Sequence, residues 1–425
     1  MSRPHSWALA PEEPLLGSAP EGANLYEKFI ARQPIFDEKL KLFAYELLFR
    51  ASPENCFRPQ KEASSGLIVD STMLFDLQML TGNAKAFINV DLSALLRGAA
   101  RLLPPNRVII EILETITPTP EVVQLCQELR SSGYVLALDD YIGHPKWDVL
   151  LPLVKFLKVD FRAADSDVRA DIVRRHKGHG LQFLAEKVET QSELDEARAL
   201  GYSFFQGYFF CKPAMLSTRE IPGNKLNYLQ LLAAVSTPGF SREAVEELFK
   251  GDLSLVYKLL RYMNSPLLGL RGEIHGVREA IELLGETEFR RWVSILAIIA
   301  MAGDKPPELI RTAITRGFFC EAMSEPAGIS PQGSNLFLMG VLSVTDAILD
   351  RPIEEILLSL PISPQIRTAL CGGANRFRDI YETLLAYERA DWPALATAAA
   401  RLGPIESLIP DCYTSATERS ATLAS

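Results

Sequence analysis

The chain has 425 residues, of which 48% are hydrophobic, and a formal net charge of −9. This length predicts two or three domains, each large enough for its own core. The acidic balance argues against a DNA partner held through phosphate contacts, because those contacts need clustered Lys and Arg. Six widely spaced cysteines without a C-x-x-C pair are typical of a reducing compartment, not of a disulfide framework or a zinc site.

Neither the N-terminal segment nor the longest apolar run predicts a signal peptide or a membrane-spanning helix. Residues 1–24 mix Pro, Gly and Glu without a long apolar core, which predicts a disordered tail and not a signal peptide. The longest apolar run, Trp292 to Gly303, is too short to span a bilayer and predicts a buried helix. We therefore expect a cytoplasmic protein with no membrane partner.

The first half of the chain alternates short β-rich runs with helix-like segments, one of which ends at Gly133, a predicted C-cap. This alternation predicts right-handed crossovers and a parallel sheet buried on both faces. A doubly wound open sheet is the alternative, but no Gly-rich phosphate loop follows the first strand. We favour an α/β TIM-like (β/α)8 barrel over residues 25–213. The predicted strands read IARQPIF, LFAYELLF, AFINV, RVIIEIL, VLALDD, KFLKVD, FLAEKV and FFQGYFF.

The second half has a different texture. Residues 214–225 break the pattern and predict a linker. From residue 226 to residue 411 the periodicity is helical, with Gly285 punctuating one helix, which predicts an all-α domain. Residues 412–425 lack apolar periodicity and predict a frayed C-terminal tail.

Polar side chains recur where the predicted strands end, and the paired Asp139 and Asp140 close an apolar strand. In a parallel barrel these ends face one mouth, where active sites are built. So many carboxylates cannot all stay ionised without cations, and Mg²⁺ or Mn²⁺ suits oxygen ligands. Two such ions would predict a two-metal hydrolase that catalyses a phosphoryl displacement, with a structural rim as the alternative. The residues are Glu46, Asn89, Glu111, Asp139, Asp140, Lys158, Glu186, Glu189 and Gln206.

An ordered series of motifs resembles the EAL domain, the family of cyclic di-GMP phosphodiesterases. Residues 45–50 read YELLFR, and the resemblance continues through QPIFD, FINVD, EILE, LDDY, FLKVD, AEKVET and QGYFFCKP. It covers residues from about 25 to 213 in order, which makes it far more specific than one motif. It implies an EAL-type barrel that binds cyclic di-GMP.

The resemblance also implies a role for each matching residue. Glu46, Asn89, Glu111 and Asp139 match one metal site, and Asp139, Asp140 and Glu186 match a second. Lys158 would hold the attacking water or the phosphoryl charge, Glu186 would position or deprotonate that water with support from Glu189, and Gln206 would orient the lysine or the phosphate. Gln33, Pro34 and Arg50 match positions that hold the ligand.

The helical half is similar to the HDOD domain, a relative of the HD phosphohydrolases. The stretches DLSLVYKLLRYMNSP, REAIELLG and FLMGVLSVTDAIL carry this similarity. Ser343 and Val344 stand where catalytic HD proteins have a metal-binding His-Asp pair, and neither ligates metal at neutral pH. The resemblance therefore implies a non-catalytic interaction or output domain with an unknown signalling partner, in a bacterial protein.

Two departures from the EAL pattern bear on activity. After Asp140 the chain reads YIGHPKWDVLL, where active members have a Gly/Ser-rich loop that helps to place the metal and governs barrel pairing. Leu113 replaces the usual Thr of the Glu-Leu-Thr-Glu string. The sequence thus leaves two hypotheses, a phosphodiesterase or a catalytically inactive receptor or scaffold, with a metal-dependent barrel lyase as a third reading and homodimerisation open. A permanent salt link from Lys158 to the carboxylates would weigh against the metal site.

Overall fold

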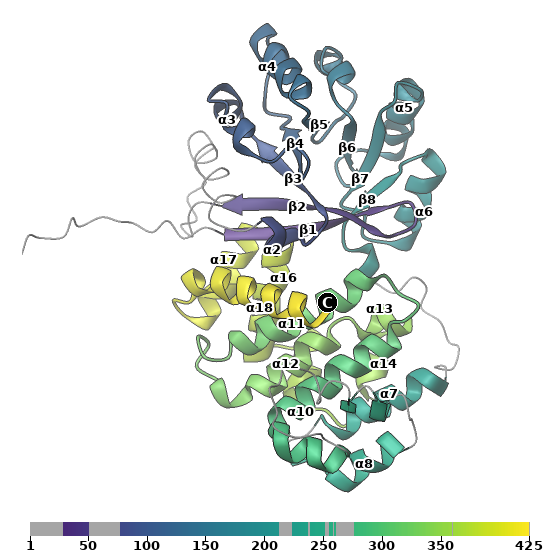
Figure 1. Ribbon diagram of the computed structural model, residues 1–425, viewed down its shortest axis with the longest axis vertical. Helices are drawn as coiled ribbons and strands as arrows, with labels where there is room; N and C mark the ends of the chain where they lie inside the picture. Colours follow the sequence, from purple (N-terminus) through teal and green to yellow (C-terminus); the bar gives the residue numbers. More distant parts are fainter. Residues whose placement is uncertain are drawn as a thin grey trace, which may run out of the picture.

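A computed structural model of the chain describes residues 29–50, 77–211, 223–236, 239–250, 255–257, 259–260, 276–358 and 360–424. Two lobes stack along the long axis of the molecule, a barrel above and a helical half below (Figure 1). The expected N-terminal tail and most of the expected linker lie outside the described residues.

The eight predicted strands are all present and close into a barrel in sequence order, which decides against the open-sheet alternative. Helices cover the outer side of the later strands, as the top of Figure 1 shows. The strands are β1 (Phe29–Asp37), β2 (Leu42–Arg50), β3 (Lys85–Val90), β4 (Val108–Ile112), β5 (Val135–Leu138), β6 (Phe156–Asp160), β7 (Gln182–Glu186) and β8 (Phe204–Gln206). The helices of this half are α2 (Leu77–Thr81), α3 (Leu92–Leu96), α4 (Pro120–Ser131), α5 (Ser166–His176) and α6 (Gln191–Leu200).

The expectation of an all-parallel sheet is wrong for one strand. β1 runs antiparallel to both of its neighbours, β2 and β8, while the other adjacent pairs are parallel. Only four residues connect β1 to β2, and a parallel crossover needs a dozen or more. The turn is closed by the Asp37 carboxylate, which accepts hydrogen bonds from the backbone N–H groups of Lys39 and Lys41 at 2.9 Å each.

Local sequence signals explain where several helices begin and end. Thr190 caps α6 in a capping box with Glu193, and Gly201 ends that helix in the left-handed conformation at φ 104°. Gly133 follows α4 with φ 90°, as predicted from the sequence. The punctuation expected at Gly285 is a kink inside α10, where φ is 75°.

The described residues of the second half form helices and no strand, as predicted. Most of the run from Trp292 to Gly303 forms the last part of α10, which ends at Met301, and most of its side chains are buried. In the described part of the chain, no helix combines the length and apolarity needed to cross a bilayer. The helices are α7 (Gly223–Ala234), α8 (Arg242–Lys250), α10 (Val277–Met301), α11 (Pro307–Ala322), α12 (Gly333–Leu342), α13 (Thr345–Leu349), α14 (Ile353–Leu358), α15 (Pro364–Leu370), α16 (Arg376–Glu388), α17 (Trp392–Leu402) and α18 (Ile409–Ala424).

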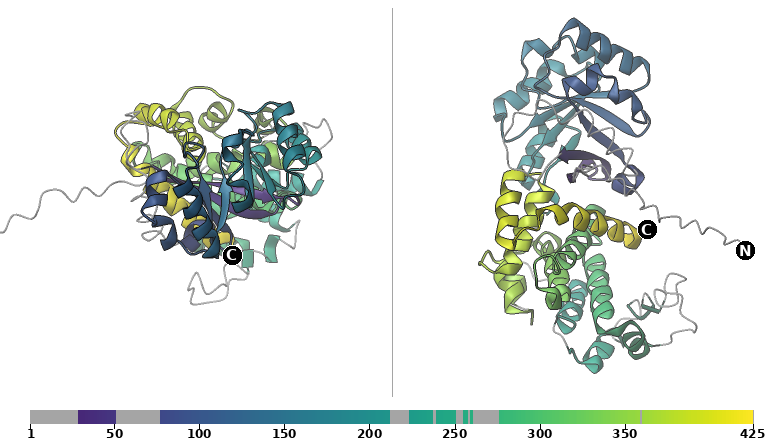
Figure 2. Two further views of the ribbon diagram at one scale, coloured as in Figure 1. Left: turned by 90° about the horizontal axis from the view of Figure 1, so that it is seen from above. Right: turned by 90° about the vertical axis from the view of Figure 1, so that its left-hand side faces the viewer.

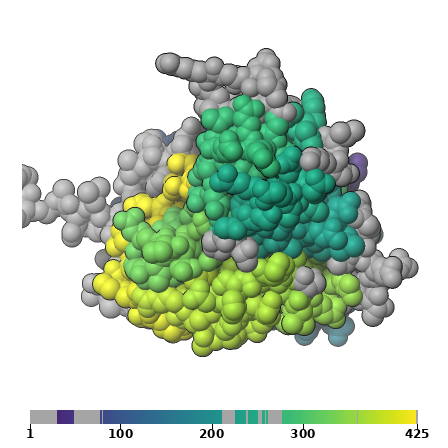
Figure 3. Space-filling model, turned by 90° about the horizontal axis from the view of Figure 1, so that it is seen from below, coloured from purple at the N-terminus to yellow at the C-terminus, as the bar shows by residue number. Residues whose placement is uncertain are grey.

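The expected frayed C-terminal tail is instead the helix α18. Tyr413, Ala416, Thr417 and Ser420 are buried at helical spacing, and the helix packs against α11. Alanine, threonine and serine supply most of this face, so an analysis based on large apolar residues misses it. From the side away from the barrel, the teal helices α7 and α8 lie beside the yellow-green later helices (Figure 3).

The helical half covers the outer face of the β1–β2 hairpin. Both views in Figure 2 place the yellow helices beside these two strands. The Tyr387 hydroxyl of α16 bonds both backbone groups of Ile30, accepting from its N–H at 3.2 Å and donating to its carbonyl at 3.1 Å. Tyr45 of β2 donates to Glu308 of α11 at 2.8 Å. One apolar cluster runs through both halves, so the junction is a packed interior.

Candidate functional site

The interior of the barrel consists of two layers of side chains, one apolar and one polar. Alternate residues of a strand point inward, so the polar layer lies two residues along each strand from the apolar layer. The apolar layer takes one residue from each strand: Ile35, Ala44, Phe87, Ile109, Ala137, Phe156, Leu184 and Phe204. Two positions further toward the mouth stand Gln33, Glu46, Asn89, Glu111, Asp139, Lys158, Glu186 and Gln206. We call these eight residues and Asp140 the acidic cluster.

Because β1 is antiparallel, Gln33 precedes its apolar neighbour Ile35 instead of following it. The backbone register places Gln33 opposite Glu46, and Ile35 opposite Gln206. The convergence expected from the strand ends is therefore present, and it includes a residue from the middle of β1.

Lys158 is the centre of the acidic cluster. Its side chain is 0% exposed, and its ammonium lies 2.8 Å from Glu111, 2.9 Å from Glu186, 3.0 Å from Asp139 and 3.3 Å from Glu46. The salt link that weighs against a metal site is thus present. One ammonium nevertheless compensates the charge of only one of the four carboxylates, so the others must bind cations or protons.

Two amide side chains bond Glu46 directly, and a third bonds one of those two amides. Asn89 donates to its Oε1 at 2.9 Å, and Gln206 donates to its Oε2 at 2.6 Å. The same Gln206 nitrogen donates to Gln33 Oε1 at 2.9 Å. These bonds and the nearby lysine lower the pKa of Glu46, against the effect of burial.

Four further members of the cluster, Glu111, Asp140, Lys158 and Glu186, have shifted pKa values. Burial and the neighbouring carboxylates raise the pKa values of Glu111 and Glu186 well above the usual range. Burial alone would lower the pKa of Lys158, but the four carboxylates raise it well above its usual value. Burial and the charge of Asp139 raise the pKa of Asp140 to about 6. These directions all follow from crowding negative charge in a dry interior.

The donor set fits hard divalent cations. Asn89 Oδ1, Glu111 Oε2, Glu186 Oε2 and Gln206 Oε1 are buried with no hydrogen-bond donor among the residues that the structure describes. Such oxygens are costly to bury unless they coordinate a cation or a donor. Glu114, Asp139 and Asp140 also bring carboxylate oxygens within 4.8 Å of one another, on the open side of the cluster. Carboxylate and amide oxygens without histidine or cysteine favour Mg²⁺, Mn²⁺ or Ca²⁺ over zinc.

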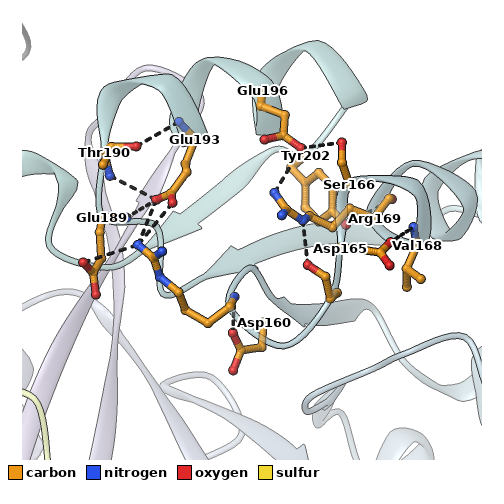
Figure 4. Close-up of polar contacts among 12 residues, drawn as sticks. Asp160, Asp165, Ser166, Val168, Arg169, Glu189, Thr190, Glu193, Glu196 and Tyr202 are labelled. Carbon is orange, nitrogen blue, oxygen red and sulfur yellow. Dashed lines mark hydrogen bonds and ion pairs between the residues drawn. The ribbon is translucent and has the colours of Figure 1, made fainter.

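Glu189 lies apart from the lysine, at the mouth of the barrel. Its carboxylate pairs with Arg162 at 3.3 Å, and its side chain is 46% exposed. Figure 4 shows Glu189 beside the capping box of Thr190 and Glu193, with Asp160 below them. Its expected supporting role therefore stays a prediction.

The predicted ligand-binding residues occupy different sides of β1 and β2. Gln33 points into the barrel, whereas Pro34 lines a cavity of about 30 Å³ at the junction, together with Tyr45 and Glu308. Arg50 closes β2, and its side chain lies outside the described residues. Of the two whose side chains the structure describes, Gln33 belongs to the acidic cluster and Pro34 faces the junction.

The loop after Asp140, which departs from the EAL pattern, is anchored to the barrel. Asp140 itself has φ 40°. The Tyr141 N–H donates to the Lys158 carbonyl at 2.8 Å, and its hydroxyl bonds His176 at 2.9 Å. Trp147 is buried at 4% exposure. A backbone hydrogen bond and the side chains of Tyr141 and Trp147 therefore anchor this loop.

Sequence reasoning missed two residues near the cluster. Glu114 lies three positions after Glu111, just beyond the end of β4, and Asp139 lies just beyond the end of the neighbouring strand β5. This position next to Asp139 was the signal in the sequence. Lys187 follows Glu186 with φ 55° and pairs with Asp160 at 2.5 Å, linking the ends of β6 and β7. No pattern in the sequence distinguishes Lys187 from an ordinary surface lysine.

Fold and site together define a class of protein: an eight-stranded barrel with a buried acidic cluster and one lysine, joined to an all-helical domain. Family models match both parts, the EAL domain over residues 83–213 and the HDOD domain over residues 221–348. The chain belongs to the family that joins an EAL domain to an HDOD domain. This membership follows from relatives that are similar over most of their length.

Two of these relatives cover both domains. The cyclic di-GMP phosphodiesterase CdgJ of Vibrio cholerae is 33% identical over 385 residues, 89% of each chain. YuxH of Bacillus subtilis is 34% identical over 400 residues, which cover 92% of this chain and 97% of that protein. Among solved structures, the calcium and cyclic di-GMP complex of Klebsiella pneumoniae BlrP1 is 26% identical, covering 45% of this chain and 56% of that chain, with a TM-score of 0.37.

Proposed function

We propose that this chain is a bacterial cyclic di-GMP signalling protein whose barrel binds the nucleotide and hydrolyses it to the linear dinucleotide pGpG. The observation that carries the proposal is the polar layer, in which four carboxylates converge within 3.3 Å of one lysine and leave buried oxygens without donors. The similarity to CdgJ over 89% of the chain supports the choice of substrate.

The residues present suit two divalent ions, for which we propose Mg²⁺ or Mn²⁺. Glu46, Asn89, Glu111 and Asp139 would hold one, and Asp139, Asp140 and Glu186 would hold the other. Bound there, the ions would lower the pKa of a water molecule and stabilise charge on the phosphoryl oxygens. Asp139 belongs to both sets, which gives the paired aspartates at the end of β5 their chemical reason.

The chain's own groups would perform the proton transfer and the charge stabilisation. Cations on the carboxylates would take over the charge compensation that Lys158 supplies, and the lysine ammonium could then face the phosphoryl oxygens. Glu186 would hold or deprotonate the attacking water, and its second oxygen, which has no hydrogen-bond donor among the described residues, supports this role. Gln206 would orient the lysine or phosphate, Glu189 would act from the mouth, and Gln33, Pro34 and Arg50 would hold the nucleotide.

We propose that the helical half is a non-catalytic module for an unknown signalling partner. Ser343, at one of the positions where HD enzymes carry their metal-binding pair, donates to the Gly340 carbonyl at 2.7 Å and accepts from Arg316 at 3.2 Å. Among the described residues, the only carboxylate group with metal-like spacing lies in the barrel. The HDOD partnership is thus the basis of an output role, not of a second hydrolase.

The experiment incubates the purified chain with cyclic di-GMP and Mn²⁺ and follows pGpG by chromatography. We expect turnover that falls about 10²-fold or more in Glu46→Gln, because that variant keeps the volume but loses the charge of a metal ligand. Glu38→Gln, in the exposed turn between β1 and β2, is the matched control and should retain activity. Nucleotide binding in Ca²⁺ without any turnover in Mn²⁺ would instead favour the inactive receptor.

A further inference from the structure

A chain of polar contacts crosses the junction and ends on the proposed metal ligand Glu46. In the helical half, Arg316 of α11 pairs with the Glu388 carboxylate of α16, donating at 3.0, 3.2 and 2.7 Å. The backbone carbonyl of the same Glu388 accepts a hydrogen bond from Gln33 of β1 at 3.5 Å. Gln33 accepts from Gln206, which also donates to Glu46. We call these five residues the junction relay.

Each member of the relay is buried or half-buried, so water competes poorly for its contacts. Arg316 is 3% exposed, Glu388 6%, Gln206 2% and Glu46 5%. Glu388 is the last residue of α16, where backbone carbonyls have no partner inside the helix. Its carbonyl is therefore available for Gln33.

The relay fixes the direction of two side-chain amides. An amide group offers donors on one side and an acceptor on the other, and a carbonyl can only accept. The Glu388 carbonyl therefore selects the orientation in which the Gln33 nitrogen faces the helical half and the Gln33 oxygen faces Gln206. Gln206 must then present its nitrogen to both Gln33 and Glu46.

If the Glu388 carbonyl were displaced, nothing in the relay would select this orientation of Gln33. A flipped Gln33 would present its nitrogen to Gln206, which would turn its own oxygen toward the Gln33 nitrogen. The donor to Glu46 would be replaced or withdrawn, and a carboxylate facing an amide oxygen is repelled. The Arg316–Glu388 ion pair holds the end of α16 in the position where its carbonyl reaches Gln33.

We propose that Glu388 of the helical half is a positioning residue for Glu46, so that the end of α16 sets the affinity of the barrel for its divalent cations. This inference rests on the proposed metal site and adds the helical half to it. A partner that displaces α16 would thereby change the metal occupancy of the barrel without contacting it.

The test measures the affinity of the full chain for Mn²⁺ in the absence of nucleotide. The concentration of free Mn²⁺ is followed by electron paramagnetic resonance. The first variant combines Arg316→Met with Glu388→Gln, which removes both charges of the buried pair and leaves neither uncompensated. The second is Gln33→Met, and the third combines all three changes. Tyr387→Phe is the matched control, because it breaks two bonds between the same helix and β1 outside the relay.

We expect the dissociation constant for Mn²⁺ to rise about 10- to 100-fold in each of the first two variants, as for other partners of metal ligands. The combined variant should be no weaker than the worse of the two, because both break one chain of contacts. Tyr387→Phe should stay within about twofold of the wild type. A merely structural role would shift this control and the relay variants alike.

Two results would overturn the proposal: unchanged Mn²⁺ affinity in folded Gln33→Met, or effects that simply multiply in the combined variant. If the paired variant does not fold, Gln33→Met alone remains decisive, because it introduces no buried charge. Failure of the proposed function looks different: relay variants weaken Mn²⁺ binding, yet the wild type forms no pGpG. A wild type that binds no Mn²⁺ would refute both.

Discussion

Replacing Lys158 tests whether the ion pairs of the acidic cluster hold the barrel together. Lys158→Met keeps an unbranched side chain, one atom shorter, and removes the one cation that four carboxylates share at 2.8–3.3 Å. Lys158 is fully buried, so solvent screens only poorly the charge that its removal would leave. Removing one partner of a buried ion pair costs about 3–5 kcal/mol. In a domain of this size that corresponds to a melting temperature lower by about 6–20 °C.

The assay is thermal unfolding followed by circular dichroism, in EDTA and then with Mn²⁺. Mn²⁺ at about one hundred times its dissociation constant stabilises a folded state that binds it by about 2.7 kcal/mol. We expect Mn²⁺ to raise the melting temperature of Lys158→Met more than that of the wild type, because the variant has lost its own cation. Lys155→Met, an exposed lysine on the same segment, should change stability by no more than about 0.5 kcal/mol.

A variant as stable as the wild type in EDTA would refute this reasoning, since the four ion pairs would then contribute nothing. Equal effects of Mn²⁺ on both proteins would refute the second half, because the cation would not be replacing the lysine.

Two further substitutions test the packing beside the site and at the end of the chain. Gly207→Ala would place a Cβ atom 2.1 Å from the Val188 carbonyl oxygen at φ 141°, so we expect the free energy of unfolding, measured with denaturant, to fall by about 2–6 kcal/mol. Gly82→Ala, with φ 59° and open space around it, should lower it by only about 1–2 kcal/mol. Equal losses in the two variants would contradict the steric argument. Tyr413→Ala in α18 should cost about 3–5 kcal/mol, because its ring packs 4.7 Å from Tyr387 in the junction. The exposed Glu418→Ala is its control, and no difference between the two would mean that the end of the chain is frayed after all.

Much of the acidic cluster could be predicted from strand ends alone. Because side chains alternate along a strand, a polar residue two positions beyond a buried one must enter the same interior, and this holds for Glu111, Asp139 and Lys158. This rule fails for β1, because β1 is antiparallel and its polar residue therefore precedes the apolar one along the chain. Its contribution, Gln33, was found only through resemblance to a family.

What the sequence by itself determined is the set of elements and their inward faces, because hydrophobic periodicity, caps and strand-ending carboxylates are local properties of the chain. It also carried the motifs from YELLFR to QGYFFCKP, which point to the EAL domain. Tertiary structure alone decided which charges meet and which end up neutralised. The four contacts of Lys158 and the link from Glu388 through Gln33 to Glu46 join residues that are far apart in the sequence, by hundreds of positions in the second case. That the end of the chain forms the helix α18 was likewise seen only in the structure. No local pattern encodes such distances, since they depend on how two separately folded faces pack together.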